Sequence, residues 1–213
     1  MSAYFVTSCG TGRGKTHLCE VLISEWLFQG LTVEVLKPIV SGFENDSVNG
    51  SDTGRLLAAI GQKINSQNVD HVSPWRYAAP LSPDMAAARE GRSVPVDDVI
   101  AYCRRIIVSS AADVVLIEGV GGAMVPIDRD RTVRDLIAAL SVPTILVVGS
   151  YLGSLSHALT AYESLIQKDI KIDRIVINEM GDSNIPLSET RDALSRFVHD
   201  IPVVITPFSP SVQ

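Results

Sequence analysis

The sequence lacks long uncharged hydrophobic runs, clusters of basic residues and paired cysteines. No segment approaches the roughly 18 consecutive apolar residues of a membrane span, and the first residues lack the basic-then-apolar pattern of a secretory signal. The formal net charge of -6 comes without a Lys/Arg block, which argues against nucleic acid or an anionic membrane as a partner. We therefore expect a cytoplasmic protein whose partners are small molecules.

Cysteine usage points to the same compartment. The three cysteines, Cys9, Cys19 and Cys103, form an odd set without CxxC spacing. This pattern disfavours both a disulfide framework and a zinc site, and it favours a reducing environment.

What the sequence does contain is enough apolar residues for one substantial core. Hydrophobic residues make up 46% of the 213 positions, and no repeat, low-complexity tract or shift in composition marks a boundary. We expect residues 1–213 to form a single domain.

Short β-branched runs alternate with stretches of helical periodicity. The runs do not alternate strictly between apolar and polar residues, so they suit parallel strands covered on both faces. This rhythm predicts an α/β fold: a three-layer, doubly wound, mostly parallel sheet. The predicted strands are Tyr4–Thr7, Thr32–Leu36, Asp113–Ile117, Thr144–Val148, Arg174–Ile177 and Val203–Ile205. The predicted helices are Lys15–Gln29, Val96–Ser109, Thr132–Leu140, Leu155–Lys168 and Leu187–His199.

Ligands of such folds gather beyond the carboxyl ends of the strands, so residues just after each strand become the functional candidates. Two segments, Gly42–Asp52 and Ser73–Pro83, are rich in turn-forming residues. We interpret both as loops laid over that edge of the sheet.

A phosphate-binding loop follows the first predicted strand. Residues 8–16 read Ser-Cys-Gly-Thr-Gly-Arg-Gly-Lys-Thr and open the first predicted helix. Glycines let backbone N–H groups turn towards phosphate oxygens, Lys15 can bridge the β- and γ-phosphates, and Thr16 can offer a hydroxyl to magnesium. The alternative is a tight turn at Gly10, Gly12 and Gly14 with Lys15 in solvent.

Other side chains of this loop are less defined by the pattern. Cys9 stands where the strict motif has glycine, so we interpret it as a backbone contributor rather than a nucleophile. Arg13 either touches phosphate or faces solvent, and the same two possibilities hold for His17.

Two acids are placed to bind magnesium, which prefers hard oxygen ligands. Glu118 ends the apolar run 114–117 and precedes a glycine-rich turn, the position of the metal-binding acid in P-loop proteins. Its alternative role is to cap a neighbouring loop. Asp52 precedes a helical stretch and is equally consistent with an N-cap.

Lys37 ends the second predicted strand. A lysine at this edge is costly to desolvate without a compensating anion, so we expect it to point at the reaction centre and stabilise charge on a transferring phosphoryl group. The alternative is a side chain that reaches out to water. Ser41 and Gly42 follow closely and could hold a second substrate.

Taken together, these segments make the chain similar to the ATP-dependent dethiobiotin synthetases over nearly its whole length. Beyond the phosphate-binding loop, the segments that carry the resemblance are 37–42, 51–52, 79–84, 90–92, 118–122, 149–153 with His157, and Asn178. Their order and spacing are more specific than any one motif.

The resemblance implies a P-loop ligase that uses ATP and Mg²⁺ to close a ureido ring on 7,8-diaminononanoate with CO₂. It implies a homodimer in which Leu152, Gly153 and Ser154 of one subunit meet the substrate held by the other. Lys37 and Lys15 would be catalytic, and Thr16, Asp52 and Glu118 would bind the metal. The implied nucleotide contacts are Gly10, Thr11, Gly12, Arg13, Gly14, Lys15, Thr16, His17, Asn178 and Pro207. The implied substrate contacts are Lys37, Ser41, Leu81, Ser82, Gly121, Leu152, Gly153 and Ser154.

The chain departs from the family at the start of the loop, where Gly10 and Gly12 stand in place of acids, and these changes affect any substrate contact made from there. Two alternatives share the fold: a related ATP-dependent amide ligase or phosphotransacetylase-associated domain, and a ParA/MinD-like nucleotide switch. The segments 37–41 and 81–83 disfavour the first. The second usually carries an extra lysine early in the loop, where this chain has Gly10.

Overall fold

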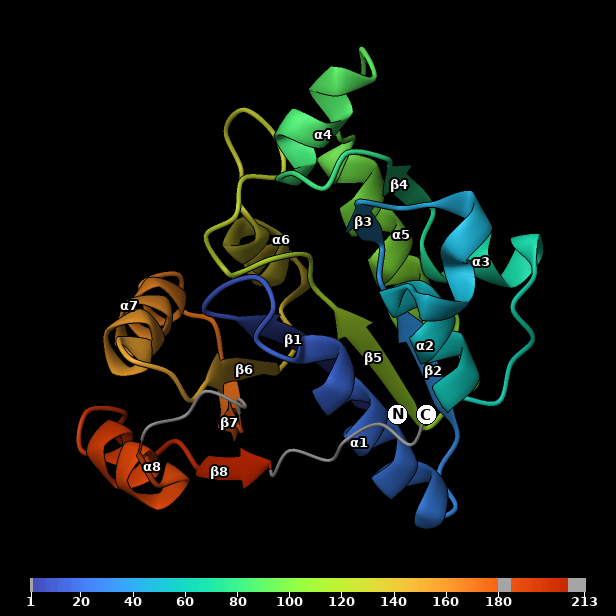
Figure 1. Ribbon diagram of the computed structural model, residues 1–213. Helices are drawn as coiled ribbons and strands as arrows, with labels where there is room; N and C mark the ends of the chain where they lie inside the picture. Colours follow the sequence, from blue (N-terminus) through green and yellow to red (C-terminus); the bar gives the residue numbers. More distant parts are fainter. Residues whose placement is uncertain (1, 180–184, 207–213) are drawn as a thin grey trace.

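The computed structural model describes residues 2–179 and 185–206. Its centre is a six-stranded sheet in which every neighbouring pair is parallel and the strand order is β2-β5-β1-β6-β7-β8 (Figure 1). This arrangement confirms the predicted α/β class. The strands are β1 (Ser2–Ser8), β2 (Val33–Leu36), β5 (Val114–Glu118), β6 (Thr144–Gly149), β7 (Ile172–Asn178) and β8 (Val203–Thr206).

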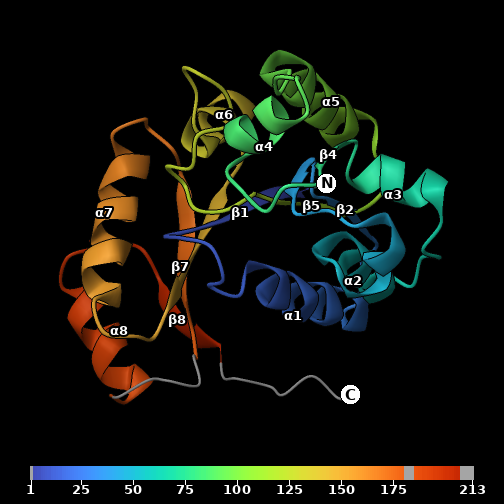
Figure 2. The ribbon, with the colours of Figure 1, turned by 45° about the horizontal axis from the view of Figure 1, so that its top comes forward.

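Helices cover both faces of the sheet, and Figure 2 shows the three layers. Alternate residues of the central strands supply two separate cores: Phe5 of β1 belongs to one and Val6 to the other. On the Val6 face lie α1 (Lys15–Phe28), α2 (Asp52–Ala59) and α3 (Ser66–Val72). On the Phe5 face lie α4 (Pro83–Arg89), α5 (Val96–Ser109), α6 (Val133–Leu140), α7 (Ser154–Ile166) and α8 (Leu187–Ser195).

The two segments predicted to be loops contain regular structure. Within 42–52 lies a 3-10 helix, η1 (Asn45–Gly50). Within 73–83 lies β4 (Trp75–Tyr77), which pairs in parallel with β3 (Ile39–Ser41) in a separate two-stranded sheet. A three-residue strand is too short to show the alternation of apolar and polar residues that predicts a strand. The glycine and proline content of these segments therefore led to the prediction of loops.

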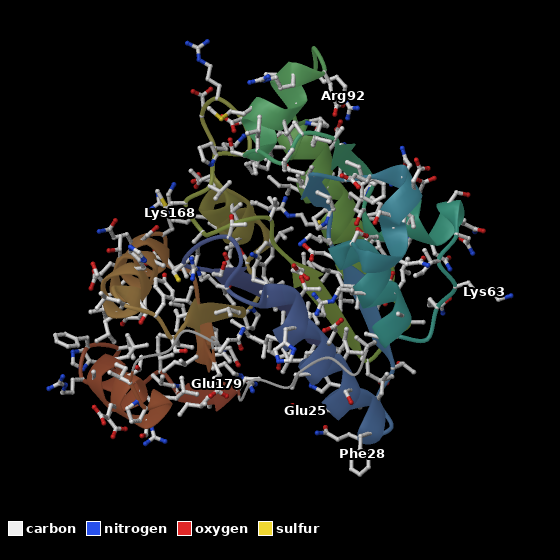
Figure 3. All side chains as sticks on the ribbon, viewed as in Figure 1. Glu25, Phe28, Lys63, Arg92, Lys168 and Glu179 are labelled. Carbon is white, nitrogen blue, oxygen red and sulfur yellow. The ribbon has the colours of Figure 1, made fainter. Side chains whose placement is uncertain are left out.

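Strand register brings the predicted functional positions to one edge. Val6 pairs with Glu118 and Leu36 with Ile117, so Ser8, Lys37 and Glu118 all follow or end neighbouring parallel strands at their carboxyl ends. Helix α1 begins at this edge and runs away from it. Phe28 at its other end is 93% exposed and points away from the protein (Figure 3).

Candidate active site

A cavity of about 650 Å³ lies at the carboxyl edge of the sheet. Its walls come from the phosphate-binding loop, the ends of β2 and β5, the start of α2 and the segment before α4. The lining residues are Thr11, Gly12, Arg13, Gly14, Lys15, Thr16, His17, Lys37, Val40, Ser41, Asp52, Arg55, Pro80, Leu81, Ser82, Pro83, Glu118, Val120, Gly121 and Val125.

The backbone of the phosphate-binding loop needs its glycines. Gly14 has φ of 80°, and a Cβ there would lie 2.4 Å from Nδ2 of Asn178. That amide donates hydrogen bonds to the carbonyl oxygens of Arg13 (2.9 Å) and Gly14 (3.0 Å). A substituent on Gly122 would in turn approach the backbone nitrogen of Gly10 to 2.9 Å. The loop is thus fixed by close backbone packing, as a cradle of main-chain N–H groups requires.

The charged side chains of Lys15, Lys37, Asp52 and Glu118, which come from four separate segments of the chain, converge at this loop. The ammonium of Lys37 lies 2.5 Å from Oε1 of Glu118 and 2.7 Å from Oδ2 of Asp52. The hydroxyl of Thr16 donates to the same Glu118 oxygen at 2.8 Å, and Lys15 donates to Ser8 Oγ at 3.3 Å. The alternative interpretation, in which the Lys37 side chain reaches out to water, is wrong, because only 3% of the residue is exposed.

Electrostatics distinguish the two lysines. Burial alone lowers the pKa of Lys37, but the carboxylates of Glu118 and Asp52 outweigh it and leave the pKa raised. Burial, followed by repulsion from Lys37, lowers the pKa of Lys15 to about 8. Asp52 has a lowered pKa because Lys37 overcomes the effect of burial. Lys37 is therefore a firmly charged cation, whereas Lys15 has no strong anionic partner within residues 2–179 and 185–206.

The donor set fits a hard divalent cation. Thr16, Asp52 and Glu118 bring a hydroxyl and two carboxylates together, and Oε2 of Glu118 is buried without a hydrogen-bond partner among the described residues. Mg²⁺ typically takes one or two carboxylates, with water and phosphate oxygens completing its shell. The N-cap interpretation of Asp52 is wrong, because Ser51 caps α2 by accepting a hydrogen bond from Gly54 N.

A second group of lining residues faces this charged cluster. Ser41, Leu81, Ser82 and Gly121 all border the cavity, as the sequence analysis expected for substrate contacts. Ser41 Oγ is buried and has no hydrogen-bond partner in the described part of the chain. Such a hydroxyl is available to a bound molecule.

Arg13 lines the cavity with its guanidinium 4.0 Å from the centre of the Tyr151 ring, so a purely solvent-facing side chain is not what the structure shows. The hydroxyl of Tyr151 lies 2.8 Å from Nδ1 of His157. His17 also borders the cavity, and its Nε2 is buried with no hydrogen-bond partner among the residues described.

Other predicted site residues lie elsewhere. Gly10 lies within the loop and Asn178 donates hydrogen bonds to carbonyl oxygens of the loop, but neither is among the residues that line the cavity. The segment 152–154 lies at the start of α7, and Leu152 is 94% exposed. Pro207 is outside the described residues. Among the cavity residues that the sequence analysis missed is Arg55, although it follows Asp52 by three positions and so shares its helix face.

Comparisons with known proteins agree with this geometry. The family described as an AAA domain matches residues 2–207. Among solved structures, the septum site-determining protein MinD complexed with Mg-ADP from Pyrococcus horikoshii OT3 has a TM-score of 0.53 at 17% identity and covers 98% of this chain and 82% of its own. The hydrogenase maturation factor HypB from Archaeoglobus fulgidus has a TM-score of 0.54 at 16% identity, with 97% and 81% covered. These likenesses show the fold alone.

Relatives at higher identity specify the family. ATP-dependent dethiobiotin synthetase BioD of Acidiphilium cryptum is 45% identical over 203 residues, which cover 95% of this chain and 91% of the relative. The protein of the same name from Caulobacter vibrioides is 40% identical over 207 residues, which cover 97% and 93%. A P-loop, a buried lysine and two carboxylates thus accompany extensive sequence identity, and the chain belongs to the family of ATP-dependent dethiobiotin synthetases.

Proposed function

We propose that this chain is an ATP-dependent dethiobiotin synthetase acting in biotin biosynthesis. One amine of 7,8-diaminononanoate adds to CO₂ and loses a proton, which gives a carbamate. A carbamate oxygen attacks the γ-phosphorus of ATP, ADP leaves, and a carbamic-phosphoric anhydride forms. The second amine then attacks the carbonyl carbon, loses a proton and expels inorganic phosphate as the five-membered ureido ring closes.

The phosphate-binding loop holds the nucleotide in this proposal. Main-chain N–H groups of Thr11–Thr16 face the phosphates, and Lys15 bridges the terminal two. Its pKa of about 8 in the free protein supports this role, because an anion placed beside it would favour the charged form. Gly10, Arg13, His17, Asn178 and Pro207 are the further proposed nucleotide contacts.

Thr16, Asp52 and Glu118 would hold Mg²⁺ against the terminal phosphates. When bound, the ion supplies charge neutralisation for the transferring phosphoryl group. The support comes from the three oxygen donors gathered in one cluster and from the buried oxygen of Glu118 that has no partner among the described residues.

Lys37 is the proposed catalytic cation. It is nearly fully buried and firmly charged, contacts both carboxylates proposed to bind the metal, and lines the same cavity as the proposed substrate contacts. There it stabilises the carbamate and the charge that develops on the transferring phosphoryl group. Ring closure needs no protein nucleophile, because a bound anhydride and its own second amine react within one molecule.

The diamine lies against Ser41, Leu81, Ser82 and Gly121 in this proposal. The protein is a homodimer, and the partner subunit's Leu152, Gly153 and Ser154 meet the distal carboxylate of the diamine. Exposure of Leu152 supports an interface at this segment. We also propose one domain over residues 1–213 and a cytoplasmic location. In the described part of the chain, no helix is both long and apolar enough to cross a bilayer.

The observation that carries the proposal is the convergence of Lys15, Thr16, Lys37, Asp52 and Glu118 on one cavity in a chain 45% identical to a dethiobiotin synthetase. The test incubates the purified protein with 7,8-diaminononanoate, bicarbonate and magnesium-ATP, and detects the ring-closed product by mass spectrometry. Product is expected only from the complete mixture, with one ADP released for each ring closed. ATP turnover without ring closure would refute the proposed reaction.

A further inference from the structure

An ion pair between α1 and α2 lies one helical turn below the proposed metal-binding residues. Glu20 follows Thr16 by four positions on α1, and Arg55 follows Asp52 by three positions on α2, so each shares a helix face with a proposed metal ligand. Nε and Nη2 of Arg55 donate to the two carboxylate oxygens of Glu20, at 2.8 and 2.5 Å. This two-point contact fixes the plane of the guanidinium.

Arg55 also borders the cavity itself. Its contact with Glu20 uses one edge of the guanidinium and leaves Nη1 outside the ion pair. Hydrogen bonding to Glu20 is the largest influence that raises the pKa of Arg55, and the negative charges of Asp52 and Glu118 raise it further. The guanidinium is therefore within electrostatic reach of both carboxylates proposed to bind magnesium.

We propose that Arg55, oriented by Glu20, binds the γ-phosphate of the nucleotide as a third cation beside Lys15 and Lys37. This inference rests on the proposed function. Arg55 would touch a phosphate oxygen on the side of the metal, and Glu20 would act as a positioning residue. A fixed guanidinium suits this position because its orientation is set before the charge on the phosphoryl group develops.

The competing explanation is that the ion pair only ties α1 to α2. Both side chains are about one-third exposed, and such pairs add at most about 1 kcal/mol to stability. Under that explanation, loss of Arg55 would lower thermal stability slightly and leave the nucleotide's affinity unchanged. The two explanations therefore differ in what happens to phosphate binding.

The test compares Arg55→Gln, Arg55→Lys and Glu20→Gln with the matched control Arg131→Gln. Arg131 has a similar exposure of 33% and also forms ion pairs, with Asp97 and Asp128, but it does not border the cavity. Calorimetry measures the dissociation constants with which each protein binds magnesium-ADP and magnesium-β,γ-imido-ATP. Steady-state kinetics and thermal unfolding follow on the same preparations.

We expect Arg55→Gln to weaken binding of the imido analogue about tenfold and that of ADP by less than about twofold. The kcat for ring closure should fall about 10- to 100-fold, below the effect of a fully buried donor because Arg55 is partly exposed. Arg55→Lys should recover part of the loss, Glu20→Gln should show a smaller loss of the same kind, and Arg131→Gln should show neither.

Equal unfolding shifts in Arg55→Gln and Arg131→Gln, with unchanged affinity for the imido analogue in both, would overturn the inference. An equal loss of ADP and imido-analogue affinity would also overturn it, because it would place Arg55 away from the terminal phosphate. If the unaltered protein makes no ring-closed product, the proposed function fails. The binding measurements still decide the role of Arg55 in that case.

Discussion

The substitution Lys37→Met tests how the charges of the site are balanced. In the structure the Lys37 ammonium contacts both Glu118, which is 1% exposed, and Asp52. Methionine keeps most of the length of the side chain and its apolar character but removes the ammonium and its charge. The variant therefore leaves two carboxylates close together, and the Glu118 carboxylate stays buried without its cation.

The size of the effect follows from the burial of each partner. Removing one member of a buried ion pair costs about 3–5 kcal/mol, because the remaining charge stays desolvated. The Asp52 side chain is 45% exposed and can be hydrated, so we expect a loss of about 2–4 kcal/mol. For a chain of this size that loss lowers the unfolding temperature by about 4–16 °C.

Thermal unfolding at neutral pH, with and without millimolar Mg²⁺, measures this loss. Mg²⁺ should stabilise Lys37→Met more than the unaltered protein, because no ammonium competes for the two carboxylates in the variant. The double variant Lys37→Met/Glu118→Gln should regain part of the lost stability, since it also removes the buried charge that Lys37→Met leaves unpaired on Glu118. Lys63→Met is the control, because Lys63 projects into solvent at the edge of the protein (Figure 3).

A shift in Lys37→Met no larger than that in Lys63→Met would refute this reasoning. So would an identical response of the variant and the unaltered protein to Mg²⁺. Either result would mean that Lys37 does not balance the charges of Glu118 and Asp52 in solution.

Two further predictions concern the phosphate-binding loop. In Gly14→Ala, a residue with a φ of 80° would carry a Cβ only 2.4 Å from Asn178 Nδ2, whereas in Gly61→Ala the φ is 69° and the Cβ meets open space. Gly14→Ala should therefore lose nucleotide affinity and clearly more stability than the roughly 1 kcal/mol expected from φ alone in Gly61→Ala. Equal losses of stability on denaturant unfolding would contradict the packing described here. Because the pKa of Lys15 is about 8 in the free protein and 10.5 ordinarily, the folded state binds fewer protons than the unfolded state between those values, and the contribution of Lys15 to stability rises with pH across that window. A bound triphosphate should raise the lowered pKa of Lys15 again, so the protein should take up protons when it binds nucleotide above about pH 8 and take up few at pH 6. Calorimetry in buffers of different ionisation enthalpy measures this proton uptake, and its absence would place the phosphates away from Lys15.

The fold and the strand-end residues were predictable because a parallel sheet brings the carboxyl ends of its strands to one edge. Lys37 and Glu118 end or follow neighbouring strands β2 and β5, so their proximity follows from topology once the strands are recognised. The ion pair between Lys37 and Glu118 was not predicted. The sequence analysis matched Glu118 with magnesium and Lys37 with the transferring phosphoryl group, whereas the two side chains form an ion pair with each other in the structure.

Residues on the short elements were harder to place. Strands β3 and β4 have three residues each, and their chain segments contain glycine and proline that favour a loop interpretation. Arg55 was missed for a related reason: its role depends on α2 lying beside α1, a tertiary contact that spacing alone does not reveal. The spacing of Thr16 to Glu20 and of Asp52 to Arg55 becomes informative only when the two helices are known to pack together.

The most direct test of the account is a crystal structure of the protein with Mg²⁺ and β,γ-imido-ATP. We predict the terminal phosphates on the loop Gly12–Thr16 and the metal about 2.1 Å from oxygens of Thr16, Asp52 and Glu118. The Lys37 ammonium should leave Glu118 and approach the γ-phosphate. A nucleotide bound elsewhere, or a metal held without these three residues while Lys37 keeps both carboxylates, would contradict the account.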